Sequence, residues 1–141
     1  MGMEASIKLT VTLNSGRKLV NDSMCYWRKN WNVVQRIFDI LGKNPNEDIE
    51  YYKINKGDLQ EIKQFLLDCC ENSASIEKYD CWSDAGAFIC SCYQNAAEIQ
   101  KIQLLRNKQL QIYDIFPDEF ENGYDPDDNI IDITVEFDYS P

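Results

Sequence analysis

The stretch CYWRKNW, residues 25–31, decides how the first third of this chain folds. It places three aromatic rings, two cations and a thiol in seven positions, which suits either a buried helix start or an exposed platform that stacks on a nucleotide. On a helical wheel at ~100° per residue, Trp27 and Trp31 share a stripe that continues through Val34, Phe38 and Leu41. Arg28 and Lys29 point away from that stripe. Burying each large ring stabilises a fold by roughly 2–3 kcal/mol, so the pattern favours a helix whose tryptophans face the core.

Further helical patterns follow along the chain. We expect the first helix to begin at a cap formed by Asp22 or Ser23. A second helix is expected to begin near Asn55, because Asp58 three residues later favours a helix N-terminus. The buried stripe of this second helix consists of Leu59, Ile62, Phe65, Leu66, Cys69 and Cys70. A third helix is predicted from about residue 93 to beyond residue 106.

Both ends of the chain alternate apolar and polar residues, which is typical of half-buried strands. The alternation covers residues 7–13 and residues 131–138, and a turn at 14–16 allows 17–20 to return as another strand. The segment 84–89 fits either a loop or a short strand. The predicted fold class is therefore α+β, with about three helices packed against a small antiparallel sheet that the N- and C-terminal strands form.

With 141 residues, the chain is expected to form a single domain over residues 1–141. The terminal strands are expected at about 6–20 and 130–138, a helical body at about 22–116 and an acidic loop at about 117–129. No apolar run approaches the roughly 20 residues that span a bilayer, and the first residues do not resemble a signal peptide. We therefore expect a cytoplasmic protein that does not bind a membrane.

The absence of histidine excludes a large group of mechanisms. Ser–His and Cys–His catalysis and two-histidine metal sites all require an imidazole that titrates near neutral pH. The six cysteines lack the paired spacing of structural zinc ligands, and in a reducing compartment they are expected to pack as small hydrophobic side chains. The sequence predicts neither a cofactor nor a metal.

Negative charge is concentrated at one end of the chain. The net charge is −10, and the residues from Gln109 onwards contain ten carboxylates and no Lys or Arg. Residues 1–108 therefore sum to zero. Such a segment disfavours direct binding to nucleic acid and attracts a basic partner surface.

Carboxylates spaced along a strand and loop can imitate the phosphates of a nucleic acid and occupy a basic groove of a host protein, such as a nucleic-acid-binding nuclease. The candidate partner-binding residues are Asp125, Asp127, Asp128, Asp132, Glu136 and Asp138. A second hypothesis is a module that sequesters a signal nucleotide, with Arg28, Lys29 and Arg36 binding its phosphate. A third is a carboxylate-dependent metal enzyme, although no particular pair among the 24 acids is singled out and no catalytic residue is assigned.

Several short motifs resemble a loose group of small uncharacterised bacteriophage and prophage proteins. The resemblance consists of Tyr26-Trp27-Arg28-Lys29 at a helix start, the step Glu50-Tyr51-Tyr52 before a Leu-rich helix, and the run Gly86-Ala87-Phe88-Ile89-Cys90-Ser91. It covers about residues 25–105, and Val34 stands where that group commonly has a histidine. The resemblance implies a viral accessory protein that acts inside a bacterium. The leading hypothesis is thus a non-catalytic, anti-CRISPR-like inhibitor of a defence protein that targets nucleic acid.

Overall fold

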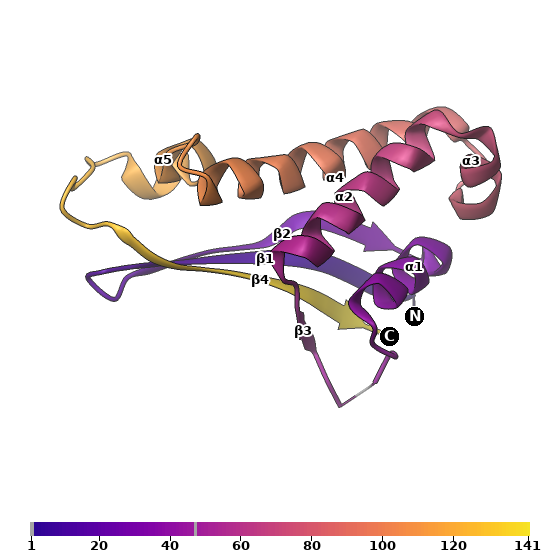
Figure 1. Cartoon of the computed structure of the whole chain (residues 1–141), viewed down its shortest axis with the longest axis horizontal. Coiled ribbons are helices and arrows are strands. Elements are labelled where there is room, and N and C mark those ends of the chain that lie inside the picture. Colours follow the sequence, from indigo (N-terminus) through magenta and orange to yellow (C-terminus); the bar gives the residue numbers. More distant parts are fainter. Residues whose placement is uncertain (1, 47) are drawn as a thin grey trace.

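In a computed structural model, which describes residues 2–46 and 48–141, the protein is built on a four-stranded antiparallel sheet (Figure 1). The strand order is β2-β1-β4-β3. The strands are β1 (Glu4–Leu13), β2 (Lys18–Arg28), β3 (Tyr51–Lys53) and β4 (Ile130–Ser140). The first and last strands pair along nearly their whole lengths, from Glu4 opposite Ser140 to Leu13 opposite Ile130. The α+β class and the pairing of the terminal strands are therefore confirmed.

The helical part contains more elements than the three that were expected. The described residues form α1 (Trp31–Leu41), α2 (Lys56–Glu71), α3 (Ser73–Tyr79), α4 (Ala85–Arg106), α5 (Ile112–Ile115) and a 3-10 helix (Pro117–Phe120). Figure 1 shows α2 and α4 lying side by side over one face of the sheet. None of the helices in the described ranges is both long enough and apolar enough to span a bilayer.

The helix expected to begin at Asp22 or Ser23 is wrong, because residues 18–28 form β2. Trp27 pairs with Ala5 of β1, so the strand turns Trp27 into the core and leaves only 5% of its surface exposed. The same residues fit a two-residue period as well as a helical one, and the ladder of hydrogen bonds to β1 selects the strand. The strand ends at Arg28, and Lys29 follows it with a φ of +57°.

The helix proper begins only at Trp31. The side chain of Asn30 caps α1 by accepting a hydrogen bond from the backbone N–H of Val33 at 3.2 Å. Trp31 is consequently at the first turn and 47% exposed, with an edge-on contact to Tyr139 at 5.9 Å between ring centroids. The predicted shared stripe of the two tryptophans is thus divided between a strand and a helix.

The remaining helix predictions hold in part. The second helix has Asn55 as its cap and the expected stripe inside, except that Cys70 is only half-buried. The third helix begins already at Ala85, where the Asp84 side chain accepts from Ala87 N–H at 3.1 Å. The segment 84–89 is therefore a cap and the first turn of α4, neither a strand nor a loop.

The core lies between the sheet and the helices, with Phe38 of α1 at the centre of an aromatic cluster. Its ring meets those of Tyr52, Phe137 and Tyr139 edge-on at 5.1–5.3 Å. Since successive strand residues point to opposite faces, the alternate residues lie on the other side of the sheet. We call that side, which carries no helix, the open face; its central strands present Ser6, Lys8, Thr10, Thr134, Glu136 and Asp138.

Candidate functional site

The six predicted partner-binding acids occupy three places. Asp125, Asp127 and Asp128 lie in the loop before β4, which is held against the β1–β2 turn. There the backbone N–H and the hydroxyl of Ser15 donate to the Asp128 carboxylate at 2.9 and 2.8 Å, and Asn14 Nδ2 donates to the carbonyl of Asp127 at 2.9 Å. These contacts fix the loop while leaving the carboxylates of Asp125 and Asp127 toward solvent.

Glu136 and Asp138 lie on the open face. In the sheet register, Glu136 is flanked by Lys8 on β1 and Lys53 on β3, so its charge is largely matched by cross-strand neighbours. Asp138 has a different environment. Partial burial raises the pKa of its carboxyl, and nearby Glu50 raises it further against the opposing effect of Lys8.

The open face also exposes aromatic rings. Tyr26 of β2 is 46% exposed and Tyr51 of β3 is 43% exposed, and the Lys8 ammonium lies 4.6 Å from the centroid of the Tyr51 ring. A hydrogen bond to the Glu4 carboxylate raises the pKa of the Tyr26 hydroxyl. The face therefore exposes tyrosines at its two outer strands and carries Glu136 and Asp138 together with Lys8 and Lys53.

The three cations proposed to bind a nucleotide phosphate are not brought together. Arg28 ends β2, and the side chain of Lys29 lies against Gly2. Arg36 lies on α1 in a shallow groove whose other charged residues are Asp39 and Lys78. Arg28 and Arg36 belong to a strand and a helix, and the groove that Arg36 lines includes neither Arg28 nor Lys29. Phosphate binding by these three residues stays a prediction.

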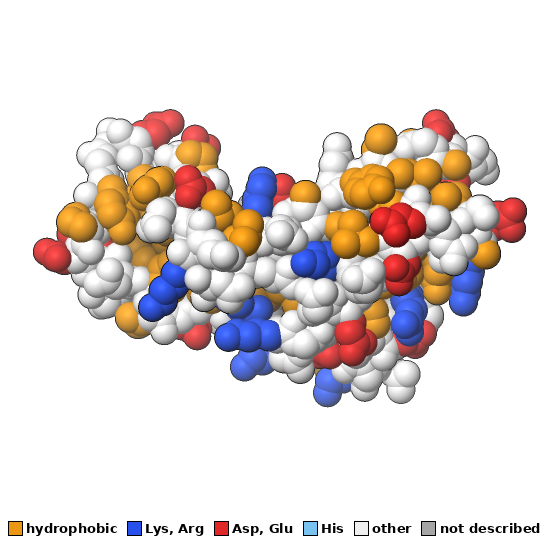
Figure 2. Space-filling model, turned by 45° about the horizontal axis from the view of Figure 1, so that its top comes forward, with side chains coloured by type: hydrophobic (Ala, Val, Ile, Leu, Met, Phe, Trp, Pro, Cys, Tyr) orange, Lys and Arg blue, Asp and Glu red, His pale blue; other side chains and the backbone are white. Residues whose placement is uncertain are grey.

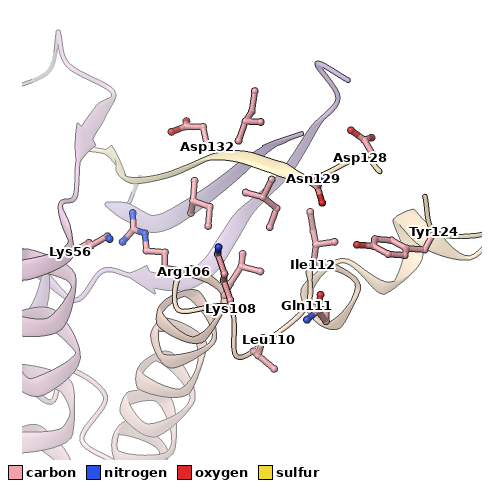
Figure 3. A pocket seen from close by; sticks show the side chains of 14 residues that line it. Lys56, Arg106, Lys108, Leu110, Gln111, Ile112, Tyr124, Asp128, Asn129 and Asp132 are labelled. Carbon is pink, nitrogen blue, oxygen red and sulfur yellow. The ribbon is translucent and has the colours of Figure 1, made fainter. Parts of the chain in front are cut away.

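A different set of cations meets at a cleft of about 680 Å³ between β4 and the C-terminal end of α4 (Figure 3). Lys56 is the first residue of α2, Arg106 the last of α4, and Lys108 follows in the next turn. Figure 3 shows the nitrogens of Lys56 and Arg106 close together at one end of the cleft. In Figure 2, with the helices turned forward, basic side chains gather across the middle of the molecule between two groups of hydrophobic ones.

Apolar side chains line the middle of this cleft. They come from β4 on one side and from the end of α4, the following connection and the start of α5 on the other: Leu105, Leu110, Ile112, Ile130, Ile131 and Ile133. The far end is polar, with Tyr124, Asp128, Asn129 and Gln111. The cleft thus has a cationic end, an apolar middle and a hydrogen-bonding end.

Arg106 is held in the cleft with an unused donor. Its Nη1 atom is inaccessible to solvent and has no hydrogen-bond partner, and within residues 2–46 and 48–141 the side chain forms no ion pair. Desolvation lowers the pKa of the guanidinium, and the charge of Asp132 opposes that effect. The Asp132 carboxylate instead accepts a hydrogen bond from the Thr134 hydroxyl at 2.8 Å. The sixth predicted partner-binding acid therefore lies at the edge of the cleft, and Figure 3 shows its carboxylate on the side of β4 away from Arg106 and Lys108.

The cysteines are all unpaired thiols, and those on α2 and α4 lie close together. A hydrogen bond between Cys69 and Cys92 lowers the pKa of Cys69 and raises that of Cys92, while burial raises the pKa of Cys70 to about 11. In the described part of the chain, no three Cys, Asp or Glu side chains converge in a way that could hold a metal ion.

The cleft was missed because its cations are distant in sequence and each sits at the end of an element. One sequence signal is Lys108, which follows α4 at a position where many helices carry glycine.

Comparisons with models of protein families, with curated proteins and with solved structures give no match for this chain. Assignment of a function therefore rests on the geometry of the open face and of the cleft.

Proposed function

We propose that the protein is a non-catalytic, phage-encoded accessory protein that docks its open face onto the basic surface of a bacterial nucleic-acid-targeting defence protein. The acids of the open face and of the neighbouring loop would meet lysines and arginines that otherwise hold nucleic acid. Of the six acids named from the sequence, Glu136 and Asp138 are the centre of this surface. Asp125, Asp127 and Asp128 extend it at the far end of β4.

The observation that carries this proposal is the crowding of negative charge around Asp138. Partial burial is the largest cause that raises the pKa of its carboxyl; Glu50, Asp22 and Glu136 raise it further, and Lys8 acts in the opposite direction. A cationic partner would reduce the repulsion that these carboxylates exert on one another in the free protein. Such a partner therefore gains attraction and removes repulsion at the same time.

The aromatic residues of the open face support docking of a protein rather than solubility alone. Tyr26 and Tyr51 are exposed on either side of Asp138, since Tyr26 and Asp138 both pair with Ser6 and Tyr51 pairs with Asp138. Tyrosine is enriched at the centres of protein interfaces, because its ring buries a large area while its hydroxyl keeps a hydrogen bond. Tyrosines beside acids suit a partner that offers arginine, which both stacks and pairs.

The proposal is tested by measuring DNA cleavage by a panel of purified CRISPR nucleases with and without the protein. We expect inhibition of at least one nuclease, with an affinity that falls as salt is raised from about 0.05 to 0.5 M. The double substitution Glu136→Gln with Asp138→Asn should weaken that inhibition by about tenfold or more. The matched control is Asp118→Asn with Glu121→Gln, which changes the net charge equally at exposed positions outside the open face.

Equal loss in the two double variants would show that only net charge matters and would remove the open face as the interface. Absence of inhibition or binding across the panel would remove the proposed class of target.

A further inference from the structure

We propose that the cleft between β4 and α4 binds a small phosphorylated molecule with a flat, largely apolar body, of the nucleoside monophosphate class. The phosphate would lie against Lys56, Arg106 and Lys108, and the body would extend over the isoleucines of β4 toward Tyr124. This site is separate from the open face and does not depend on the proposed docking function.

Charge is the first argument. The protein has a net charge of −10, yet three cations line this cleft against two acids. Neither acid forms an ion pair in the part of the chain that the structure describes: Asp128 accepts hydrogen bonds from Ser15 at the polar end of the cleft, and Asp132 accepts one from Thr134. The charge of Asp132 offsets part of the positive charge at the end formed by Lys56 and Arg106. Neither cation has an ion-pair partner among the described residues, and a phosphate dianion would match the remaining charge.

The positive region continues into a smaller groove of about 360 Å³ between α2 and α4, which also has Lys56 and Arg106 in its wall. Its third cation, Lys63, donates to the Oε1 atoms of Gln100 and Gln103 at 3.0 and 2.7 Å. All other polar residues that line this groove are Gln or Asn, so no carboxylate competes there for an incoming anion.

The unused donor of Arg106 is the second argument. A buried guanidinium nitrogen without a partner is costly, and burial that lowers the pKa of Arg106 reflects the same cost. An anion beside the guanidinium would offset that desolvation through its charge and would hydrogen-bond the remaining guanidinium nitrogens. Asp132 offsets part of this cost through its charge, but no ion pair joins it to Arg106 in the described residues.

The backbone around Lys108 is the third argument. The α4 helix ends in a Schellman motif, in which Gln109 N–H donates to the carbonyl of Leu104 at 2.8 Å and Lys108 N–H to that of Leu105 at 3.1 Å. Lys108 occupies the left-handed position of this motif with φ +61°, where glycine is favoured. The unfavourable backbone conformation of Lys108 is explained if its ammonium group, together with Arg106, binds an anion.

The apolar middle defines the rest of the ligand. Ile131 is 64% exposed and Tyr124 is 43% exposed, and both line the cleft. A volume of about 680 Å³ is suited to a ligand of nucleotide size. The side-chain amides of Asn129 and Gln111 lie beyond the apolar residues, where they could hydrogen-bond the edge of a base (Figure 3).

The test is calorimetric titration of the whole protein with four probes: AMP, phenyl phosphate, inorganic phosphate and adenosine. We expect AMP and phenyl phosphate to bind more tightly than inorganic phosphate, and adenosine to bind most weakly. Binding of inorganic phosphate as tight as that of AMP would overturn the assignment of an apolar body. No heat from AMP or phenyl phosphate at millimolar concentration would overturn the site itself.

Three variants locate the binding. Arg106→Gln should weaken AMP binding by about tenfold or more, as loss of a charge-assisted contact predicts. Lys108→Gly removes a cation together with the backbone strain, so it should weaken binding without impairing the fold. Arg36→Gln, at an exposed position on α1, is the matched control and should bind as the parent does. AMP binding that is unchanged by both cleft variants, with far-UV circular dichroism showing that they are folded, would contradict the proposal.

Discussion

Replacing Arg106 with methionine should make the free protein more stable, although it removes the cation on which ligand binding depends. The guanidinium is partly buried at the end of α4 and its Nη1 has no hydrogen-bond partner. A buried donor left unsatisfied costs about 1–3 kcal/mol. Methionine keeps a long apolar stem and fills irregular space, so the packing of the arginine stem is largely preserved.

One interaction acts against this gain. The charge of Asp132 stabilises the charged form of Arg106, but no ion pair joins the two in the part of the chain that the structure describes. An exposed attraction of this kind contributes about 0.2–1 kcal/mol. The difference leaves Arg106→Met more stable by about 1 kcal/mol. For a chain of 141 residues that corresponds to a rise in Tm of about 3 °C.

The assay is urea unfolding followed by far-UV circular dichroism, together with thermal melts in the same buffer. Arg36→Met is the control, because Arg36 is exposed on α1 and its removal should change the free energy of unfolding by less than about 0.5 kcal/mol. If Arg106→Met unfolded at lower urea than the parent with an unchanged m-value, the guanidinium would be contributing net stability. The argument that the unpaired guanidinium is destabilising until an anion binds would then be refuted.

Three other measurements test the fold and its titrating groups. Trp27→Ala should lower the free energy of unfolding by about 3–5 kcal/mol because the ring is buried, whereas Trp31→Ala should lower it by about 1 kcal/mol; equal losses in urea unfolding would contradict the different burial of the two rings. Since the pKa of Asp138 is raised, the folded state binds its proton more tightly than the unfolded chain does, and stability is lost as pH rises through the folded pKa. Asp138→Asn should therefore melt higher than the parent near neutral pH, and thermal melts between about pH 3 and 7 should show the difference disappearing in acid. Alkylation by iodoacetamide followed by mass spectrometry should modify the exposed Cys90 rapidly and the buried Cys69 only on unfolding; rapid labelling of Cys69 would contradict the packing of α2 on α4.

The terminal strands and the second helix were predictable because each is specified by a local pattern. The alternation in residues 7–13 matches the face that β1 buries, and that in β4 matches from Val135 onwards, whereas Ile131 is 64% exposed. Asn55 caps α2, as its sequence predicts. Residues 18–28 were not predictable in the same way. Their strand is stabilised by pairing with β1, and a pattern that also fits a helix cannot reveal which partner is nearby.

Charge could be counted from the sequence but not located. The six candidate acids are divided among a loop, the edge of the cleft and the open face, and Glu136 faces Lys8 and Lys53 across the sheet. The cations of the cleft were hidden for the same reason, because Lys56 and Arg106 are brought together only when α2 packs on α4. Local composition carries no information on such pairings.

The inner position of β4 has a consequence for synthesis of the protein. β4 is translated after every other strand, yet it lies between β1 and β3, so neither can obtain that neighbour until the end of β4 has left the ribosome. During synthesis, the apolar side of the β1–β2 hairpin is therefore expected to be uncovered, and the edge of β1 that later pairs with β4 is open to other chains. Chaperone dependence during expression, and aggregation of chains truncated before residue 130, follow from the order in which the sheet is assembled.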